Sequence, residues 1–243
     1  VLVGDRCQAI YGWLGAVDAM AKCEREGVAT CRLTQSFRFG PAIASEANKF
    51  LSLLRSPLRL RGYSEIESEI ATVHYADAVL CRSNAGTVIQ ALHELSLGRS
   101  VAVVGGTKQI RDLAHAAMDL KEGKGTDHRE LLAFTTWEEV REYAELDEAG
   151  KDIKVFVALI DKHGPELLIT LCERLVEEDQ ADVAISTAHR AKGREWSKVR
   201  VAEDFYPPSS DSGGDDERRL AYVTVTRAKH VLDRGSLSWI DDV

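Results

Sequence analysis

The chain has 243 residues, of which 44% are hydrophobic and 29% are charged, and its formal net charge is −8. This composition excludes a disordered or fibrous chain. The acidic balance excludes a basic coat over the whole surface but leaves room for a local basic groove. No apolar run approaches the ~20 residues that span a bilayer, and no signal peptide is visible, so we expect a cytoplasmic protein without a membrane partner. The five cysteines form no C-x-x-C pair, which favours reduced thiols.

The first part of the chain predicts two strands and two helices. Val1–Val3 is a short apolar run before a Gly-Asp loop and predicts a buried parallel strand. Because no cap or turn precedes this strand, we expect the chain to be a fragment of a longer protein. A helix over Ala16–Glu26 and a strand over Ala29–Leu33 should follow. Pro41 suits the first turn of the next helix, whose apolar face comprises Ile43, Ala47, Phe50, Leu51 and Leu54.

Strands then alternate with helices. We expect strands at Asp77–Arg82 and Ser100–Val104, each followed by a helix, at Thr87–Leu97 and Gln109–Leu120. This alternation is typical of parallel βαβ units and predicts an α/β fold.

The composition changes after Leu120. Residues 121–182 are helix-rich with charged faces, open with the linker-like Lys121–Thr126, and contain Trp137, which we interpret as a packing residue. Strands return at Val183–Thr187 and Val199–Ala202. A loop over Pro207–Asp216, a helix over Glu217–Val225 and a short strand near His230–Leu232 complete the pattern.

Polar side chains recur where the predicted parallel strands end. They are Asp5, Gln8, Gln35, Arg38, Arg82, Asn84, Thr187, His189 and Lys192. Ligands of open α/β sheets bind at this edge, and arginine and glutamine suit phosphate. The alternative is that they are ordinary solvated loop residues.

Two longer segments are more specific, namely Thr187–Trp196 and Glu217–Lys229. In the second segment, Leu220 and Val223 form the packed side of a helix, and Thr226 and Arg227 lie just past its end. A packed helix can hold such an arginine in a fixed direction.

With these segments the chain resembles the C-terminal half of a UvrD/Rep-type superfamily 1 DNA helicase. Five segments resemble family motifs in the family's order: Gly4–Tyr11 (motif III), Leu33–Arg38 (IV), Val79–Ala85 (IVa), Thr187–Trp196 (V) and Glu217–Lys229 (VI). The sequence of Gln35–Pro41, together with Asp204 and Phe205, is similar to sequences of the F-box DNA helicase branch, although no F-box is present.

The resemblance implies a RecA-like parallel sheet flanked by helices, of the P-loop NTPase type, which forms the second motor domain. Residues 1–28 would be a remnant of the first RecA-like domain. Residues 29–120 and 183–243 would form the second domain, and 121–182 a small, reduced 2B-like helical insertion.

The resemblance also implies residues that contact ATP. Gln8 matches the glutamine that senses the γ-phosphate, and Arg38 and Arg227 match two arginines that reach it from the second domain. A guanidinium can neutralise the charge of phosphoryl transfer without losing a proton. Phe37 matches an aromatic that stacks on adenine, although a core aromatic is the alternative. Gly193 and Glu195 match motif V positions near the nucleotide.

The DNA-contacting residues implied by the resemblance lie in or next to three motifs, namely III, IVa and V. Trp13 matches an aromatic on which a single-stranded base stacks, with Tyr11 near it. Arg82, Asn84, Thr187 and His189 match positions that meet the DNA backbone. For His189 the alternative is a loop histidine bonded to its own turn.

Two departures qualify this implied activity. Leu14 stands where the family usually has an arginine, and the chain contains neither a G-x-x-x-x-G-K-[ST] loop nor an acidic Mg²⁺ site. We therefore expect ATP hydrolysis, with Mg²⁺ and a missing N-terminal RecA-like domain as partners, only in the intact protein. There the chain would help to translocate on single-stranded DNA, 3′ to 5′, and to unwind duplex junctions. The alternatives are a non-catalytic helicase-like module that binds DNA or protein, and an unrelated α/β nucleotide-binding protein.

Overall fold

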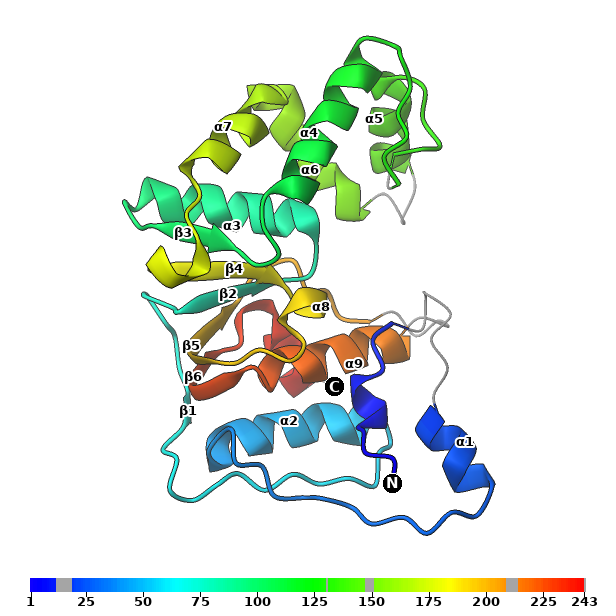
Figure 1. The fold of residues 1–243 in the computed structure, drawn as a ribbon, viewed down its shortest axis with the longest axis vertical. Coiled ribbons are helices and arrows are strands. Elements are labelled where there is room, and N and C mark those ends of the chain that lie inside the picture. Colours follow the sequence, from blue (N-terminus) through cyan, green and yellow to red (C-terminus); the bar gives the residue numbers. More distant parts are fainter. Residues whose placement is uncertain (12–18, 130, 147–150, 209–213, 243) are drawn as a thin grey trace. The chain divides into compact units, whose positions relative to one another are not determined.

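The computed structural model describes residues 1–11, 19–129, 131–146, 151–208 and 214–242 (Figure 1). The chain divides into two compact units, one of Val1–Arg82 with Ala188–Val243 and one of Ser83–Thr187. Within each unit the strands pair in parallel and helices flank them. The predicted α/β class is therefore confirmed, whereas the predicted domain bounds stay a prediction.

Among its described residues, the first unit contains four parallel strands. In spatial order they are β1 (Glu69–Ile70), β6 (Ala228–Asp233), β5 (Trp196–Val201) and β2 (Ala78–Cys81). Leu232 of β6 is paired with Ile70 on one side and Val199 on the other. All four residues of β2 are buried, as its continuous apolar sequence requires of a parallel strand covered on both faces.

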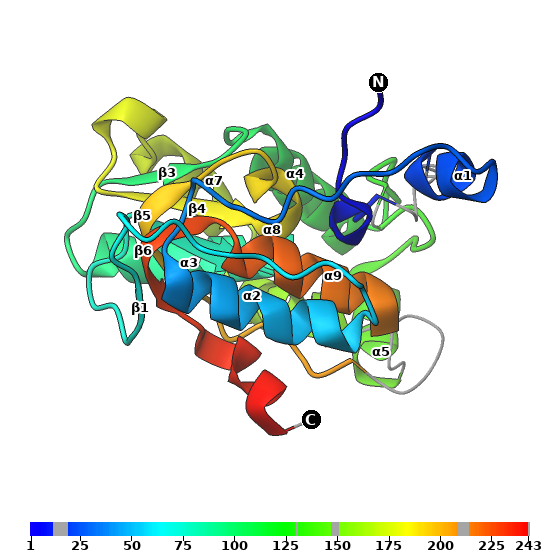
Figure 2. The ribbon, with the colours of Figure 1, turned by 90° about the horizontal axis from the view of Figure 1, so that it is seen from below.

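The helices of this unit are mostly short. They are η1 (Arg6–Gln8), α1 (Ala19–Arg25), α2 (Pro41–Leu53), α8 (Ala188–Ala191), α9 (Gly214–Val225) and η5 (Gly235–Asp242). Helices α2 and α9 pack side by side, and α2 also contacts β1 and β6 (Figure 2). The two longest helices of the unit thus support each other next to the strands.

Helix α2 forms as its sequence predicts. Pro41 is its first residue, and Ile43, Ala47, Phe50 and Leu51 are completely buried. Phe50 meets Trp239 of η5 edge-on at 5.7 Å between ring centroids, so the C-terminal segment packs against the same apolar face.

Replacing Phe50 with alanine should destabilise the protein by about 3–5 kcal/mol, because a buried ring is lost and a cavity remains. Urea unfolding followed by circular dichroism measures this loss. The matched control is Phe37→Ala: Phe37 is 72% exposed, so its substitution should cost no more than about 0.5 kcal/mol. Equal losses in the two variants would contradict the packing described.

The described part of the second unit contains two strands and a group of helices. Strand β3 (Val101–Val103) pairs in parallel with β4 (Val183–Thr187). The helices are α3 (Asn84–Ser96), α4 (Lys108–Lys121), α5 (Trp137–Leu146), α6 (Lys151–His163), α7 (Glu166–Arg174) and η4 (Glu178–Gln180). Ser83 caps α3, since its Oγ accepts a hydrogen bond from the Gly86 N–H at 2.9 Å. Helices α4 to α7 pack against one another, as the helix-rich composition predicts (Figure 1).

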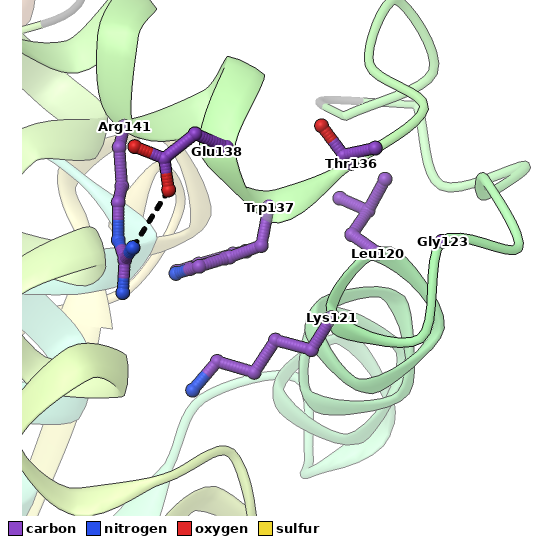
Figure 3. A pocket seen from close by; sticks show the side chains of 7 residues that line it. All are labelled: Leu120, Lys121, Gly123, Thr136, Trp137, Glu138 and Arg141. Atoms are coloured by element: carbon purple, nitrogen blue, oxygen red, sulfur yellow. Dashed lines mark hydrogen bonds and ion pairs between the residues drawn. The ribbon is translucent and has the colours of Figure 1, made fainter.

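A cavity of about 450 Å³ lies between α4 and the start of α5 (Figure 3). It is lined by Leu120, Lys121, Gly123, Thr136, Trp137, Glu138 and Arg141. Arg141 is paired with both Glu138 and Asp161, and Lys121 lies over the Trp137 ring. Trp137 itself is buried and donates its Nε1–H to Asp161, which confirms its interpretation as a packing residue.

Two predicted strands are wrong. Val1–Val3 and Ala29–Leu33 form no strand, and Val1, Val3 and Leu33 are exposed. An apolar run becomes a strand only beside a partner backbone, and among the described residues this stretch of chain offers only the isolated bridge between Gln35 and Arg61. The short elements β1 and η5 were not predicted.

The loop predicted over Pro207–Asp216 ends earlier than expected. Gly214, Asp215 and Asp216 already belong to the first turn of α9. Acidic side chains favour a helix N-terminus, and Arg218 and Arg219 pair with Asp215 and Asp216 one turn back. These local pairs extend the helix beyond its apolar stretch.

All five cysteines are free thiols, as predicted. Cys7, Cys81 and Cys172 are buried, and burial raises the pKa of each of these thiols. Cys31 is exposed. Within the described ranges, no helix combines the length and apolar character of a membrane span, and no three His, Cys, Asp or Glu side chains are grouped as metal ligands would be.

Candidate functional site

Arg38 and Arg227 meet at Thr226. The Arg38 Nη1 donates to the Thr226 carbonyl at 3.4 Å, and the Arg227 Nη2 donates to the Thr226 hydroxyl at 2.9 Å. The two residues come from motifs IV and VI, which are far apart in the sequence. The fold therefore places two guanidinium groups around one residue of the first unit.

The position of Arg227 follows from α9 and β5. Leu220–Val225 of α9 are all buried, so the end of the helix cannot shift freely. The Arg227 backbone N–H donates to the Thr224 carbonyl at 3.1 Å, and its carbonyl accepts from the Trp196 N–H at 3.0 Å. A packed helix end on one side and a strand on the other thus fix this arginine.

The Arg227 guanidinium is almost completely buried, with 1% of the residue exposed. Its Nε donates to the Val223 carbonyl at 2.9 Å and its Nη1 to the Arg194 carbonyl at 3.1 Å, so its donors meet neutral oxygens. Burial and then the nearby charge of Arg38 lower the pKa of Arg227 to about 10. It remains protonated at neutral pH, and a buried cation whose hydrogen-bond partners among the described residues are carbonyl and hydroxyl oxygens attracts an anion strongly.

Arg38 is tied to Glu195 of motif V. The Arg38 Nε donates to Glu195 Oε2 at 2.7 Å, and Lys229 Nζ lies 3.4 Å from Glu195 Oε1. The hydrogen bond from Arg38 is the main cause of the lowered pKa of Glu195. Glu195 therefore stays ionised and neutralises part of the charge of Arg38.

Phe37 lies next to Arg38 on a tightly packed loop. Its ring is 72% exposed and its centroid is 5.3 Å from that of Tyr63. A Cβ on Gly40 or Gly62 would overlap neighbouring backbone, so only glycine allows the two chain segments to approach this closely. The exposed ring excludes the alternative that Phe37 is a core aromatic.

The loop that carries Gln8 is held by motifs V and VI. Asp5 Oδ2 accepts from the Gln8 side-chain amide and from the Tyr222 hydroxyl of α9, both at 2.9 Å. Lys192 Nζ donates to the Gln8 carbonyl at 2.7 Å. Burial, together with the charge of Asp5, raises the pKa of Tyr222, so the hydroxyl keeps its proton for Asp5.

Gly193 follows α8 with a positive φ of 88°, in the left-handed region that glycine adopts without strain. It lets the chain turn from α8 toward β5, where Glu195 and Trp196 follow. Its predicted contact with a nucleotide stays a prediction.

Tyr11 and His189 are in contact. The Tyr11 hydroxyl donates to the His189 carbonyl at 2.8 Å, the two ring centroids are 6.0 Å apart, and Lys192 Nζ lies 5.4 Å from the Tyr11 ring centroid. A tyrosine, a histidine and a lysine therefore form one aromatic and cationic cluster. Trp13 and Leu14 lie outside the described residues.

Arg82 ends β2 and reaches α9. Its backbone N–H donates to Asp204 Oδ1 at 2.9 Å, and its Nε and Nη2 donate to the two oxygens of Glu217 at 3.0 and 2.7 Å. The structure thus places a predicted DNA contact beside an acidic residue. Asn84 and Thr187 belong to the second unit, where Asn84 begins α3 and the largely buried Thr187 ends β4, so a joint site with Arg82 stays a prediction.

His189 gives the protein a pH-dependent stability. Burial first, and then the charge of Arg82, lower its pKa, while Glu217 acts in the opposite direction. The folded state binds this proton less readily than the unfolded state does. Stability is therefore full above the ordinary histidine pKa of about 6.5 and falls as the pH drops through that value toward the folded-state pKa.

We expect His189→Gln to lose less stability than the wild type when the pH falls from about 8 to about 5.5. Urea unfolding of the wild type and of His189→Gln at both pH values measures the loss of stability of each protein. The carboxylates titrate in both proteins, so their contribution cancels when the two losses are compared. Equal losses would show that the His189 pKa is not lowered on folding.

Several residues that hold this site were not among the predicted contacts. Asp5 and Lys192 were recognised only as polar residues at strand ends. Tyr222, Lys229 and Glu217 lie inside the motif VI segment, so their proximity to Arg227 was visible, but their partners were not. Tyr63 has no motif around it, and no signal in the sequence pointed to it.

Comparison with known proteins adds independent evidence. The model of the UvrD-like helicase C-terminal domain matches residues 107–235, slightly more than half of the chain. Over 96% of its length the chain is 28% identical to F-box DNA helicase protein 1 of Schizosaccharomyces pombe and 30% identical to F-box DNA helicase 1 of Gallus gallus. These alignments cover 30% and 26% of the two relatives, so the chain spans less than a third of their length.

A shorter match reaches a third relative. Over 24% of its length the chain is 44% identical to the ATP-dependent DNA helicase srs2 of Schizosaccharomyces pombe, of which the match covers 7%. The family match includes Arg227 and the motif V and VI segments that hold it. Together with the α/β fold, it shows that this chain belongs to the family of UvrD-like helicase C-terminal domains.

Proposed function

We propose that the chain is part of the motor of an ATP-driven DNA helicase and supplies the second-domain half of its nucleotide site. Arg38 and Arg227 would bind the γ-phosphate, Gln8 would sense it, Phe37 would stack on the adenine, and Glu195 would lie near the sugar. Such arginines typically contribute about 10³–10⁵ in rate to phosphoryl transfer.

One observation carries this proposal: the guanidinium groups of Arg38 and Arg227 both contact Thr226. Two cations held this close repel each other, which costs free energy unless a polyanion binds between them. The charge of Arg38 indeed contributes to the lowered pKa of Arg227. A triphosphate is the polyanion that this family binds.

The geometry suggests how the half-site would work. Arg38 is partly exposed and paired with Glu195, so it would exchange this carboxylate for the γ-phosphate when a first RecA-like domain closes on ATP. Arg227 needs no such movement, because α9 and β5 already fix it. Mg²⁺ would add positive charge at the β- and γ-phosphates, and we assign no ligand for it to this chain.

We propose that single-stranded DNA contacts Tyr11, Trp13, Arg82 and His189 in the first unit, and that Asn84 and Thr187 in the second unit each contact the DNA backbone. An aromatic ring accepts any base by stacking, while arginine binds the backbone phosphates. Such contacts are independent of sequence, as translocation along DNA requires. We propose 3′ to 5′ movement and duplex unwinding on the resemblance to the family.

We propose that residues 121–182 are a reduced helical insertion with a regulatory role. They contain 17 aspartate and glutamate residues against 8 lysine and arginine residues, a net charge of −9, whereas the whole chain carries −8. A segment this acidic is repelled by duplex DNA. Its charge therefore favours regulation over duplex contact.

The test compares two preparations in a steady-state ATPase assay with single-stranded DNA. The intact protein should hydrolyse ATP and unwind a duplex with a 3′ single-stranded tail, while the 243-residue chain alone should not exceed background. Without a G-x-x-x-x-G-K-[ST] loop the β-phosphate has no backbone cradle. Turnover by the chain alone would contradict the half-site assignment, and an intact protein that binds DNA without ATP hydrolysis would favour the non-catalytic alternative.

A further inference from the structure

The phosphate-binding edge of Arg82 is occupied by a carboxylate. Its Nε and Nη2 form the side of the guanidinium that binds two oxygens at once, and both donate to Glu217. A carboxylate and a phosphate present this edge with the same pair of oxygens. Glu217 therefore stands where a DNA backbone phosphate would bind.

This pair differs from the other ion pairs of α9. Arg218 and Arg219 pair with Asp215 and Asp216 within the same helix, one turn apart, which supports the first turn of α9. Glu217 instead reaches Arg82, which lies 135 positions away in the sequence. Helix stability alone therefore does not explain its direction.

The pair is accessible to a ligand. The side chains of Arg82 and Glu217 are 27% and 31% exposed, so neither is sealed in the core. An ion pair with this exposure is weak enough for another anion to displace. The Arg82 backbone N–H is fixed on Asp204, so the residue stays in place when its side-chain partner changes.

We propose that Glu217 competes with DNA for Arg82. Its carboxylate occupies the position on the Arg82 guanidinium where a backbone phosphate would bind, and this competition limits the affinity for single-stranded DNA. This inference rests on the proposed DNA contact at Arg82. A motor must release each phosphate that it binds, and a carboxylate ready to replace the phosphate makes the release easier. Glu217 thus acts on the strength of DNA binding and not on ATP chemistry.

The test measures binding of a fluorescently labelled oligo-dT by the full-length protein without nucleotide, over a series of KCl concentrations. Glu217→Gln keeps the shape of the side chain and removes its charge. It should bind about two- to fivefold more tightly than the wild type, the scale of one partly exposed ion pair. The slope of log affinity against log salt should steepen by about 0.7, because one more phosphate is neutralised.

Asp215→Asn is the matched control. It removes the same charge from the same helix turn but releases Arg218, which is not a predicted DNA contact, so it should change affinity much less than Glu217→Gln. An equal gain in the two variants would show a general effect of net charge and overturn the inference. An unchanged or weaker affinity for Glu217→Gln would also overturn it, and would make Glu217 a support for Arg82.

Arg82→Ala separates this inference from the proposed function. Weaker binding by Arg82→Ala together with no effect of Glu217→Gln refutes the competitor and leaves the DNA contact standing. No effect of Arg82→Ala refutes both. Thermal melting followed by circular dichroism checks that the variants are folded. If Glu217→Gln unfolds, Glu217→Asp replaces it. The shorter aspartate side chain cannot hold the bidentate pair with Arg82, so this variant should give a smaller gain in affinity.

Discussion

Replacing Arg227 with alanine in the intact protein should lower the rate of ATP hydrolysis about 10³-fold or more and leave single-stranded DNA binding within about twofold. The reason is the burial of its guanidinium among neutral oxygens, from which its full charge would act on the γ-phosphate that we propose it binds. Steady-state ATPase kinetics and anisotropy of a labelled oligonucleotide measure the two effects.

Controls are needed because Arg227 also bonds the carbonyls of Val223 and Arg194. Arg219→Ala removes an arginine whose partner is Asp216 from α9, the helix that precedes Arg227, and it should retain nearly full activity. Arg227→Lys keeps the positive charge but lacks the planar guanidinium, so it should restore only part of the rate of ATP hydrolysis. Undiminished hydrolysis by a folded Arg227→Ala protein would refute the half-site.

The second large effect is expected at Arg38. Arg38→Ala should also reduce ATP hydrolysis, by about 10³-fold, because the second positive charge that we propose for the γ-phosphate is lost. The side chain is only partly buried, so its removal should leave the free energy of unfolding nearly unchanged. Arg59→Ala is the control, since Arg59 is exposed and donates to the carbonyls of Ser56 and Leu58 within its own loop.

Glu195→Gln tests the exchange proposed for Arg38. This variant removes the carboxylate that holds Arg38, so ATP should bind somewhat more tightly, whereas loss of the proposed sugar contact would weaken binding. Unchanged hydrolysis in Arg38→Ala would place the γ-phosphate elsewhere and contradict the role assigned to the Thr226 cluster.

Local sequence patterns correctly predicted the helices and strands whose own residues form an apolar face or an apolar run. Helix α2 has a proline at its start and a complete apolar face, and β2 and β4 are apolar runs that are buried along their whole length. In contrast, Val1–Val3 is as apolar as a true strand and Ala29–Leu33 alternates apolar with polar residues, but their pairing depends on a distant backbone that no local pattern reveals.

The same distinction applies to the site. The motif order indicated which side chains to examine, and the packed face of α9 indicated that Arg227 would be fixed. The partners could not be predicted, because Arg38 and Glu195 are 157 positions apart and Arg82 and Glu217 are 135 apart. Ion pairs of this kind are decided by tertiary structure, which also determines whether an acidic residue supports an arginine or competes for it.

The uneven burial of the five thiols has a practical consequence. A maleimide dye reacts with an exposed thiolate, so it should modify Cys31 first, while the raised pKa of Cys7, Cys81 and Cys172 protects those thiols. Cys31 lies only a few positions before Phe37 and Arg38. A single fluorophore attached there, after Cys23→Ser removes the half-buried thiol, would report the proposed nucleotide binding as a change in emission.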